Sequence, residues 1–450
     1  MSVTQPALSP RYASAPYGWA ALLSLLAVLY LTLLPFEFGD VAVAEAWQRF
    51  LAMEQGPIRS GARQQWVANA LMFMPLGFFL TAWLTLNRRS GLLRLLLAVV
   101  VAAFCLLVTA SVEFLQIWLP NRNPSLNDIS GNFVGGVVGA TVWVLIGRRV
   151  AAWWDQVQRE GLRINAPHLL LLYVVFYIII SLLPFDFLLS LSELQARLAS
   201  DHWSWWMRAE YCTETLPRCV ALDGTKIVLA IPVGVWLYQH FQGRHLLTVV
   251  IAGLALGLGV EAAQFLLVTG RADGWSGLLR VTGVSIGVWL AVIAARVAVH
   301  AYFQQWLREW ARVAAVLLIL PYIVMVFVLG LSHHDFHWDT DQAWAQLQSL
   351  RWLPLYYHYF VPEAVAIRSV LLTVMLYAPL GAILWLLWIE GKRPLRPVTV
   401  IGLGVGLAVM IESAKLFIDG QRPDPTSLWL AGLATWAMWR GCVWGGKRVG

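Results

Sequence analysis

Charged residues make up only 13% of this 450-residue chain, against roughly 25% in soluble globular domains. This shortage excludes an ordinary soluble domain. The four cysteines are too few for a cysteine-based metal framework, and no glycine-rich loop stands between a strand and a helix to hold a phosphate. The formal net charge of +7 comes from basic residues in the loops between apolar runs, so we expect no nucleic-acid partner. We also expect no cofactor.

Long apolar runs occupy most of the sequence, of which 59% is hydrophobic. Runs near twenty residues match a bilayer-spanning helix, whereas a membrane β-barrel would show alternation over about ten residues. We therefore predict an all-α polytopic membrane protein with about twelve transmembrane helices. The runs lie at 18–36, 66–86, 93–119, 127–147, 168–188, 219–240, 246–269, 274–297, 309–331, 364–389, 398–418 and 425–445.

Basic residues gather at the N-terminus, in every second loop and at the C-terminus. Cytoplasmic loops carry an excess of Lys and Arg, so both termini are predicted to be cytoplasmic in a protein of the cytoplasmic membrane. Residues 1–16 would form a cytoplasmic tail before an uncleaved first span. The turn within residues 111–139 would then face the outside.

Several sequence landmarks recur about 150 residues apart, which predicts an internal repeat. Leu-Pro-Phe followed by an acid and Phe stands at 34–38 and 183–187, and Pro-x-Gly begins at Pro75, Pro232 and Pro379. We predict three parallel four-helix repeats, called repeat one (17–150), repeat two (151–300) and repeat three (301–450). The matched polar positions are Glu113, Glu261 and Glu412; Gln116, Gln264 and Lys415; and Arg122, Arg271 and Arg422.

Repeat one resembles a VanZ-like domain in the order of its motifs. The resemblance is carried by Leu-Pro-Phe-Glu-Phe at 34–38, Asn69 with Phe-Met-Pro-Leu-Gly at 73–77, Glu113-x-x-Gln116, Arg122 and Asp128-x-x-x-Asn132. Repeat two keeps part of this pattern and repeat three less. The resemblance implies a multi-pass protein of the bacterial cell envelope, in a family whose founding member is associated with resistance to the glycopeptide teicoplanin.

The polar residues of repeat one are predicted to meet at one membrane level. Glu113 and Gln116 share a helix face, as do Asp128 and Asn132, because residues three or four apart are neighbours on a helix. Asn69 begins another span on the same side. Charged groups within spans are costly and mark paired or functional positions. The candidate binding residues are Asn69, Gln116, Arg122 and Asn132, and the candidates for acid–base catalysis are Glu113 and Asp128.

Several functions fit this cluster. The preferred hypothesis is binding of an amphiphilic envelope molecule, such as a lipid-linked glycan, a polysaccharide intermediate or a lipoglycopeptide antibiotic. An enzyme that uses carboxylate acid–base chemistry on such a molecule is an alternative, as are a transporter or flippase and a membrane scaffold. The residues also fit a purely structural network in which Asp128 caps its helix and Arg122 bridges carboxylates.

Two smaller features lie in loops. Cys212 and Cys219 share a loop predicted to face the outside, where disulfides persist, so we expect a bond between them. His333, His334, Asp335 and His337 have metal-ligand side chains but no second cluster, and we predict no metal site. Glycine stripes at Gly131/Gly135/Gly139, Gly253/Gly257 and Gly402/Gly406 predict close helix packing.

Overall fold

A computed structural model of the chain describes residues 13–55, 60–120, 122–160, 162–207, 216–241, 246–297, 301–331, 336, 338–361, 363–388, 395–418 and 420–446. The chain divides into two compact units. The N-terminal unit comprises residues 1–160 with 362–364, and the C-terminal unit comprises the remainder.

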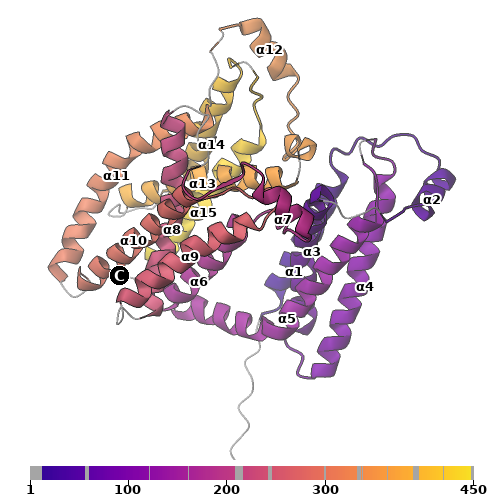
Figure 1. The fold of residues 1–450 in the computed structure, drawn as a ribbon, viewed down its shortest axis with the longest axis horizontal. Coiled ribbons are helices and arrows are strands. Elements are labelled where there is room, and N and C mark those ends of the chain that lie inside the picture. Colours follow the sequence, from indigo (N-terminus) through magenta and orange to yellow (C-terminus); the bar gives the residue numbers. More distant parts are fainter. Residues whose placement is uncertain are drawn as a thin grey trace, which may run out of the picture. The chain divides into compact units, whose positions relative to one another are not determined.

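The described part of the N-terminal unit contains five helices, which lie at the indigo and purple end of the colour scale in Figure 1. They are α1 (Ala15–Leu33), α2 (Val43–Leu51), α3 (Ser60–Thr85), α4 (Gly91–Gln116) and α5 (Leu126–Glu160). Four of them coincide with the first four apolar runs, and the short α2 lies between the first and the second run. Ser90 caps α4, because its hydroxyl oxygen accepts a hydrogen bond from the backbone N–H of Leu93 at 3.3 Å.

Helices α3 and α5 approach each other backbone to backbone. A Cβ atom placed on Gly135 would lie 2.0 Å from the carbonyl oxygen of Ala70, and one on Gly139 would lie 2.0 Å from that of Met74. Gly77 of α3 meets the carbonyl oxygen of Gly136 in the same way. The glycine stripe of repeat one is therefore the packing seam that the sequence predicted.

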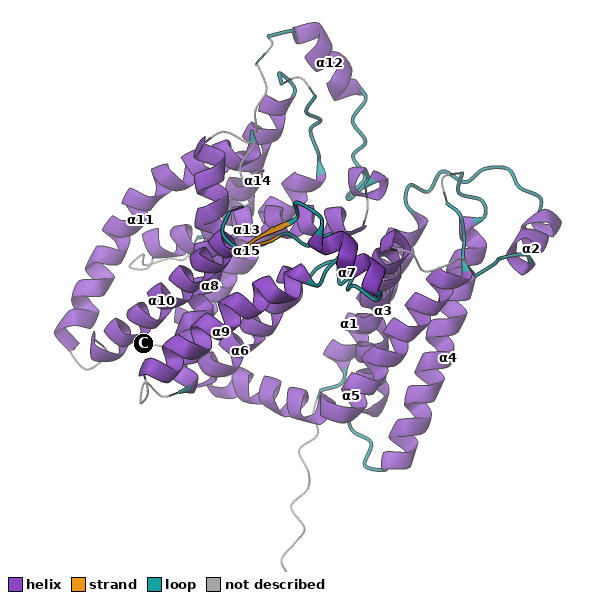
Figure 2. Cartoon of the chain, viewed as in Figure 1, coloured by secondary structure: helices purple, strands orange, loops and turns teal. Residues whose placement is uncertain are grey.

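The C-terminal unit is also mainly helical, with one short two-stranded sheet (Figure 2). Strand β1 (Trp203–Ser204) pairs in parallel with β2 (Ala272–Asp273). The helices are α6 (Leu162–Ser181), α7 (Leu191–Leu198), α8 (Leu216–His240), α9 (Leu246–Phe265), α10 (Gly274–Val297), α11 (Ala301–Gly330), α12 (Thr340–Gln348), the 3₁₀ helix η1 (Tyr357–Phe360), α13 (Glu363–Leu387), α14 (Pro397–Lys415) and α15 (Thr426–Gly446).

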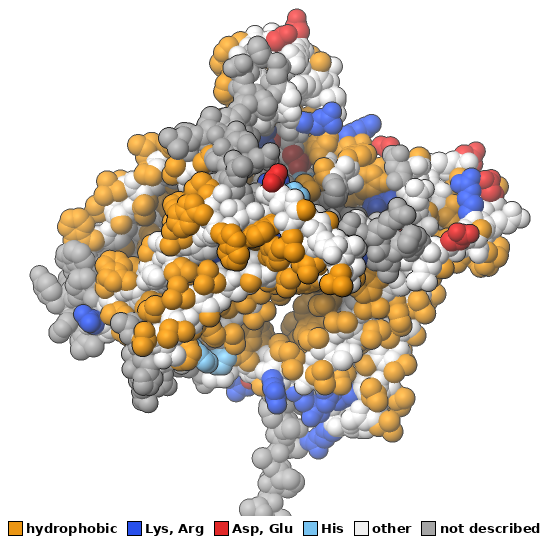
Figure 3. All heavy atoms as spheres, in the orientation of Figure 1, with side chains coloured by type: hydrophobic (Ala, Val, Ile, Leu, Met, Phe, Trp, Pro, Cys, Tyr) orange, Lys and Arg blue, Asp and Glu red, His pale blue; other side chains and the backbone are white. Residues whose placement is uncertain are grey.

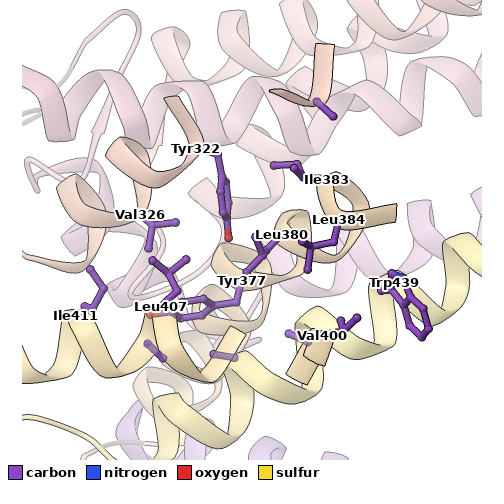
Figure 4. Close-up of a cluster of buried hydrophobic side chains, with 14 residues drawn as sticks. Tyr322, Val326, Tyr377, Leu380, Ile383, Leu384, Val400, Leu407, Ile411 and Trp439 are labelled. Atoms are coloured by element: carbon purple, nitrogen blue, oxygen red, sulfur yellow. The ribbon is translucent and has the colours of Figure 1, made fainter. Parts of the chain in front are cut away.

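The largest buried apolar cluster joins α11, α13, α14 and α15 (Figure 4). Tyr322 of α11 and Tyr377 of α13 extend into it beside Leu407 of α14. The Tyr322 hydroxyl keeps a partner inside the cluster by donating to the carbonyl oxygen of Leu376 at 2.9 Å. The prediction of close packing at the α14 glycines is wrong, however, because no atom of the described residues lies within 4 Å of a Cβ placed on Gly402 or Gly406.

Nine helices of the described chain are long and apolar enough to cross a membrane. They are α1, α3, α4, α5, α9, α10, α11, α13 and α14; α6 contains a shorter apolar helix, and α8 and α15 lie at the remaining expected spans. Hydrophobic side chains cover the helix flanks, and basic side chains gather at the lower end of the N-terminal unit (Figure 3). The protein is therefore an all-α, multi-pass membrane protein, as predicted.

Candidate functional site

The predicted polar residues of repeat one meet where α4 ends and α5 begins. Glu113 and Gln116 occupy the last turn of α4 and are 2% and 6% exposed. Asp128 and Asn132 occupy the first turns of α5 and are also buried, and Asn69 reaches them from α3. We call these five residues the polar cluster.

Glu113 helps to begin the next helix. Its Oε2 atom accepts a hydrogen bond from the backbone N–H of Ser125 at 3.2 Å, and Ser125 caps α5 by accepting the Asp128 N–H at 3.1 Å. The first N–H groups of a helix lack partners within the helix, so an acceptor from another element satisfies a donor that would otherwise be buried unpaired. This gives Glu113 a structural role.

Asp128 is held by two donors. Asn69 Nδ2 donates to its Oδ1 at 2.6 Å, which ties α3 to α5, and Ser125 Oγ donates to its Oδ2 at 2.7 Å. The Ser125 residue thus donates to both Glu113 and Asp128, one through its backbone and the other through its side chain. The two buried carboxyl groups therefore share a single turn of the chain.

The remaining amides bind neighbouring helices. Gln116 Nε2 donates to the carbonyl oxygen of Thr32 at the end of α1, at 2.8 Å. Asn132 Nδ2 donates to Thr109 Oγ1 on α4, at 2.9 Å. The other amide atom of Asn132, Oδ1, is buried and has no hydrogen-bond partner among the described residues, and the residue is only 1% exposed.

Two arginines belong to the same end of the unit. Arg122 is partly buried in the α4–α5 turn and interacts electrostatically with both Glu113 and Asp128. Arg63, 8% exposed, was not among the predicted residues. Trp66 packs against α5, because its indole N–H donates to Ser130 at 2.9 Å. Arg63 lies three residues before Trp66 and so shares its helix face, which is the sequence signal that indicates a buried Arg63.

Residues 13–147 match the model of the VanZ/LLP1 family. This segment is a VanZ-like domain. The match includes α1 to α4, most of α5 and the whole polar cluster. No curated protein and no solved structure matches the chain.

The glutamate contact of the VanZ-like domain recurs in the C-terminal unit at the same sequence spacing. Glu261 Oε2 accepts the backbone N–H of Asp273 at 3.1 Å, and Glu412 Oε2 accepts that of Asp424 at 2.8 Å. Asp273 caps α10 through its bond from Ser276 N–H at 2.7 Å, and Asp424 accepts the N–H of Thr426 at 2.9 Å. Each glutamate thus supports the start of the following helix.

The second carboxylate oxygen of Glu261 and of Glu412 contacts a basic side chain. Arg280 Nε donates to Glu261 Oε1 at 2.8 Å, and both residues are buried. Lys415 Nζ contacts Glu412 Oε1 at 2.8 Å. Arg280 also reaches the Tyr177 hydroxyl at 2.9 Å. Sequence comparison by residue type missed Arg280, although it stands as far after Glu261 as Asn132 does after Glu113.

Other predicted equivalents differ in their surroundings. Gln264 repeats the contact of Gln116, since its Nε2 donates to the carbonyl oxygen of Ser181 at 2.8 Å. Arg271 and Arg422 are exposed, unlike Arg122, and Arg422 lies 5.4 Å from the ring centre of Tyr357. The matched arginines therefore do not share one environment.

The predicted loop features lie mainly outside the described residues. Cys219 is disulfide-bonded, whereas Cys105 and Cys442 carry free thiols. Cys212, the expected disulfide partner of Cys219, lies outside the described residues. So do all four residues of the possible metal cluster, His333, His334, Asp335 and His337.

Proposed function

We propose that the chain consists of three VanZ-like repeats and that repeat one recognises an amphiphilic molecule of the cell envelope. The glutamate-to-cap hydrogen bond supports the repeats, since Glu113, Glu261 and Glu412 each accept from a backbone N–H twelve residues later. The polar cluster would face the outer side of the cytoplasmic membrane, with both termini in the cytoplasm. The basic loops at the opposite helix ends support this orientation.

One observation carries the functional proposal: the polar cluster lies beside an amphipathic aromatic helix. Phe114 follows Glu113 directly and packs against Trp47 and Phe50 of α2, with ring centres 6.0 and 5.5 Å apart. Trp47 is 53% exposed and Leu51 is 66% exposed. An apolar surface and buried polar groups at one end of a membrane domain suit a molecule that has an acyl chain and a polar head.

The proposed roles follow from the chemistry of each side chain. The exposed apolar residues of α2 would contact the acyl chain. Arg122 would attract an anionic group of the head, and Asn69, Gln116 and Asn132 would position its polar atoms. The ligand classes that fit are a lipid-linked glycan, a polysaccharide intermediate and a lipoglycopeptide.

Matched variants test this proposal. Glu113→Gln and Asp128→Asn in repeat one are compared with Glu261→Gln and Glu412→Gln, and both membrane protein level and sensitivity to teicoplanin are measured. We expect the repeat-one variants to reach normal levels and to lose the phenotype of the wild-type protein. Loss of protein in every variant would mean that the cluster serves folding alone, and the proposal would then be abandoned.

The two carboxyl groups joined through Ser125 favour one alternative, an enzyme that modifies the same molecule. Glu113 and Asp128 would act as acid and base on the bound head group. Lipid extracts of a deletion strain, complemented with the wild-type protein or with Asp128→Asn, separate the two functions. A species that changes chemically with the active protein supports an enzyme, whereas unchanged lipids support recognition alone.

A further inference from the structure

The three matched glutamates differ in what neutralises them. Arg280 supplies a guanidinium to Glu261 from the following helix, and Lys415 supplies an ammonium to Glu412 from the same helix. In both pairs one carboxylate oxygen accepts a backbone N–H and the other contacts a nitrogen cation. A buried carboxylate requires such compensation because removal from water penalises its charge.

Repeat one has neutral amides at both of these positions. Asn132 takes the place of Arg280 and Gln116 that of Lys415, counted from the glutamate in each case. Glu113 is nevertheless 2% exposed, and it forms no salt bridge within 4 Å with any described residue. Its Oε2 is used by the Ser125 N–H.

The residue one helical turn before the glutamate also differs between repeats one and two. Thr109, one helical turn before Glu113, holds the Asn132 side chain by a hydrogen bond of 2.9 Å. In repeat two the corresponding residue is Gly257, where a Cβ atom would lie 3.7 Å from the Cβ of Arg280. The longer Arg280 side chain reaches the carboxylate of Glu261, whereas the shorter Asn132 side chain bonds Thr109, which precedes Glu113 by one helical turn.

In repeat one, the side chain that stands in place of Arg280 has a buried acceptor without a partner among the described residues. Asn132 Oδ1 has no hydrogen bond, although the residue is 1% exposed. An unpaired buried carbonyl costs roughly 1–3 kcal/mol, so a donor that satisfied it would be held favourably. An ammonium or guanidinium group would supply donors to both this oxygen and Glu113.

We propose that the VanZ-like domain of repeat one binds an ammonium or guanidinium group of its ligand. This group would lie at the position that Arg280 fills in repeat two. The inference rests on the function proposed above and names the ligand class: an amphiphile whose head group carries a primary amine or a guanidinium. Arg122, which interacts electrostatically with Glu113 and Asp128, would meet an anionic part of the same head. A zwitterionic head group therefore satisfies both sides of the cluster.

Dodecylamine and N-acetyldodecylamine provide a matched pair of probes, which differ in charge while sharing the same chain. Thermal unfolding of the full-length protein in a neutral detergent is followed by tryptophan fluorescence with each probe. We expect dodecylamine to raise the unfolding midpoint and its acetylated form to have no effect. Glu113→Gln should raise the dodecylamine concentration that gives half-saturation by about tenfold, as expected for loss of a charge-assisted contact.

The double variant Thr109→Gly/Asn132→Arg recreates the Gly257–Arg280 pair inside repeat one. We expect it to fold and to lose the response to dodecylamine, because its own guanidinium would occupy Glu113. An unchanged response in both this variant and Glu113→Gln would overturn the proposal, since the amine would then bind elsewhere. If the double variant does not fold, Glu113→Gln alone decides.

Dodecyl phosphate separates failure of this inference from failure of the proposed function. Stabilisation by dodecyl phosphate that disappears in Arg122→Ala, with no effect of dodecylamine, would overturn the cation assignment and leave amphiphile recognition standing. No stabilisation by any of the three probes would count against both proposals.

Discussion

Removing the charge of Glu261 should damage folding far more than the same change at Glu113. Glu261→Gln leaves the Arg280 guanidinium buried without its carboxylate, 2.8 Å from the site of the lost charge. Breaking a buried ion pair by removing one partner costs roughly 3–5 kcal/mol. Glu113→Gln keeps an acceptor for the Ser125 N–H and breaks no ion pair, so we expect a loss of about 1–2 kcal/mol.

Unfolding of the purified protein with increasing denaturant, followed by tryptophan fluorescence, measures this difference. The double variant Glu261→Leu/Arg280→Met serves as the control, because replacing a whole buried pair by apolar residues is often neutral. We expect it to recover most of the stability lost in Glu261→Gln. Equal losses in Glu113→Gln and Glu261→Gln would refute the reasoning, since Glu113 would then have an equally strong partner.

Two further changes test the packing of the VanZ-like domain. Gly77→Ala should destabilise it by about 1–3 kcal/mol or more, since the new Cβ would lie 2.0 Å from the Gly136 carbonyl oxygen; Gly402→Ala, with open space around it, should not. Thermal unfolding compares the two. Asn69→Ala removes the 2.6 Å donor to Asp128 and should cost roughly 1–3 kcal/mol in the same assay, and an unchanged midpoint would show that this bond contributes nothing.

Hydropathy and helical spacing were sufficient to predict the helices and the level of the polar cluster. Glu113 and Gln116 fall on one face because they are three residues apart, and the α4–α5 turn returns Asp128 to the same end. The sequence also indicated the seam at Gly135, where only a glycine permits the observed backbone approach. These features depend on local periodicity, which a single sequence contains.

The partners of the polar side chains could not be predicted in the same way. Asn132 and Arg280 stand at the same spacing after Glu113 and Glu261 but differ in charge and length, so residue type alone does not relate them. Arg280 lies within an apolar run, and the structure explains its presence there through its hydrogen bonds to Glu261 and Tyr177. The packing seam predicted at Gly402 was wrong for a related reason, because a small residue permits close packing only when another helix lies opposite.

The seam between α3 and α5 also determines how the VanZ-like domain can move. With backbone against backbone and no side chain between them, these helices cannot slide or separate without losing contact along several turns. Asn69 and Asp128 therefore travel together. The polar cluster also ties α5 to α4, through the Ser125–Glu113 and Asn132–Thr109 hydrogen bonds.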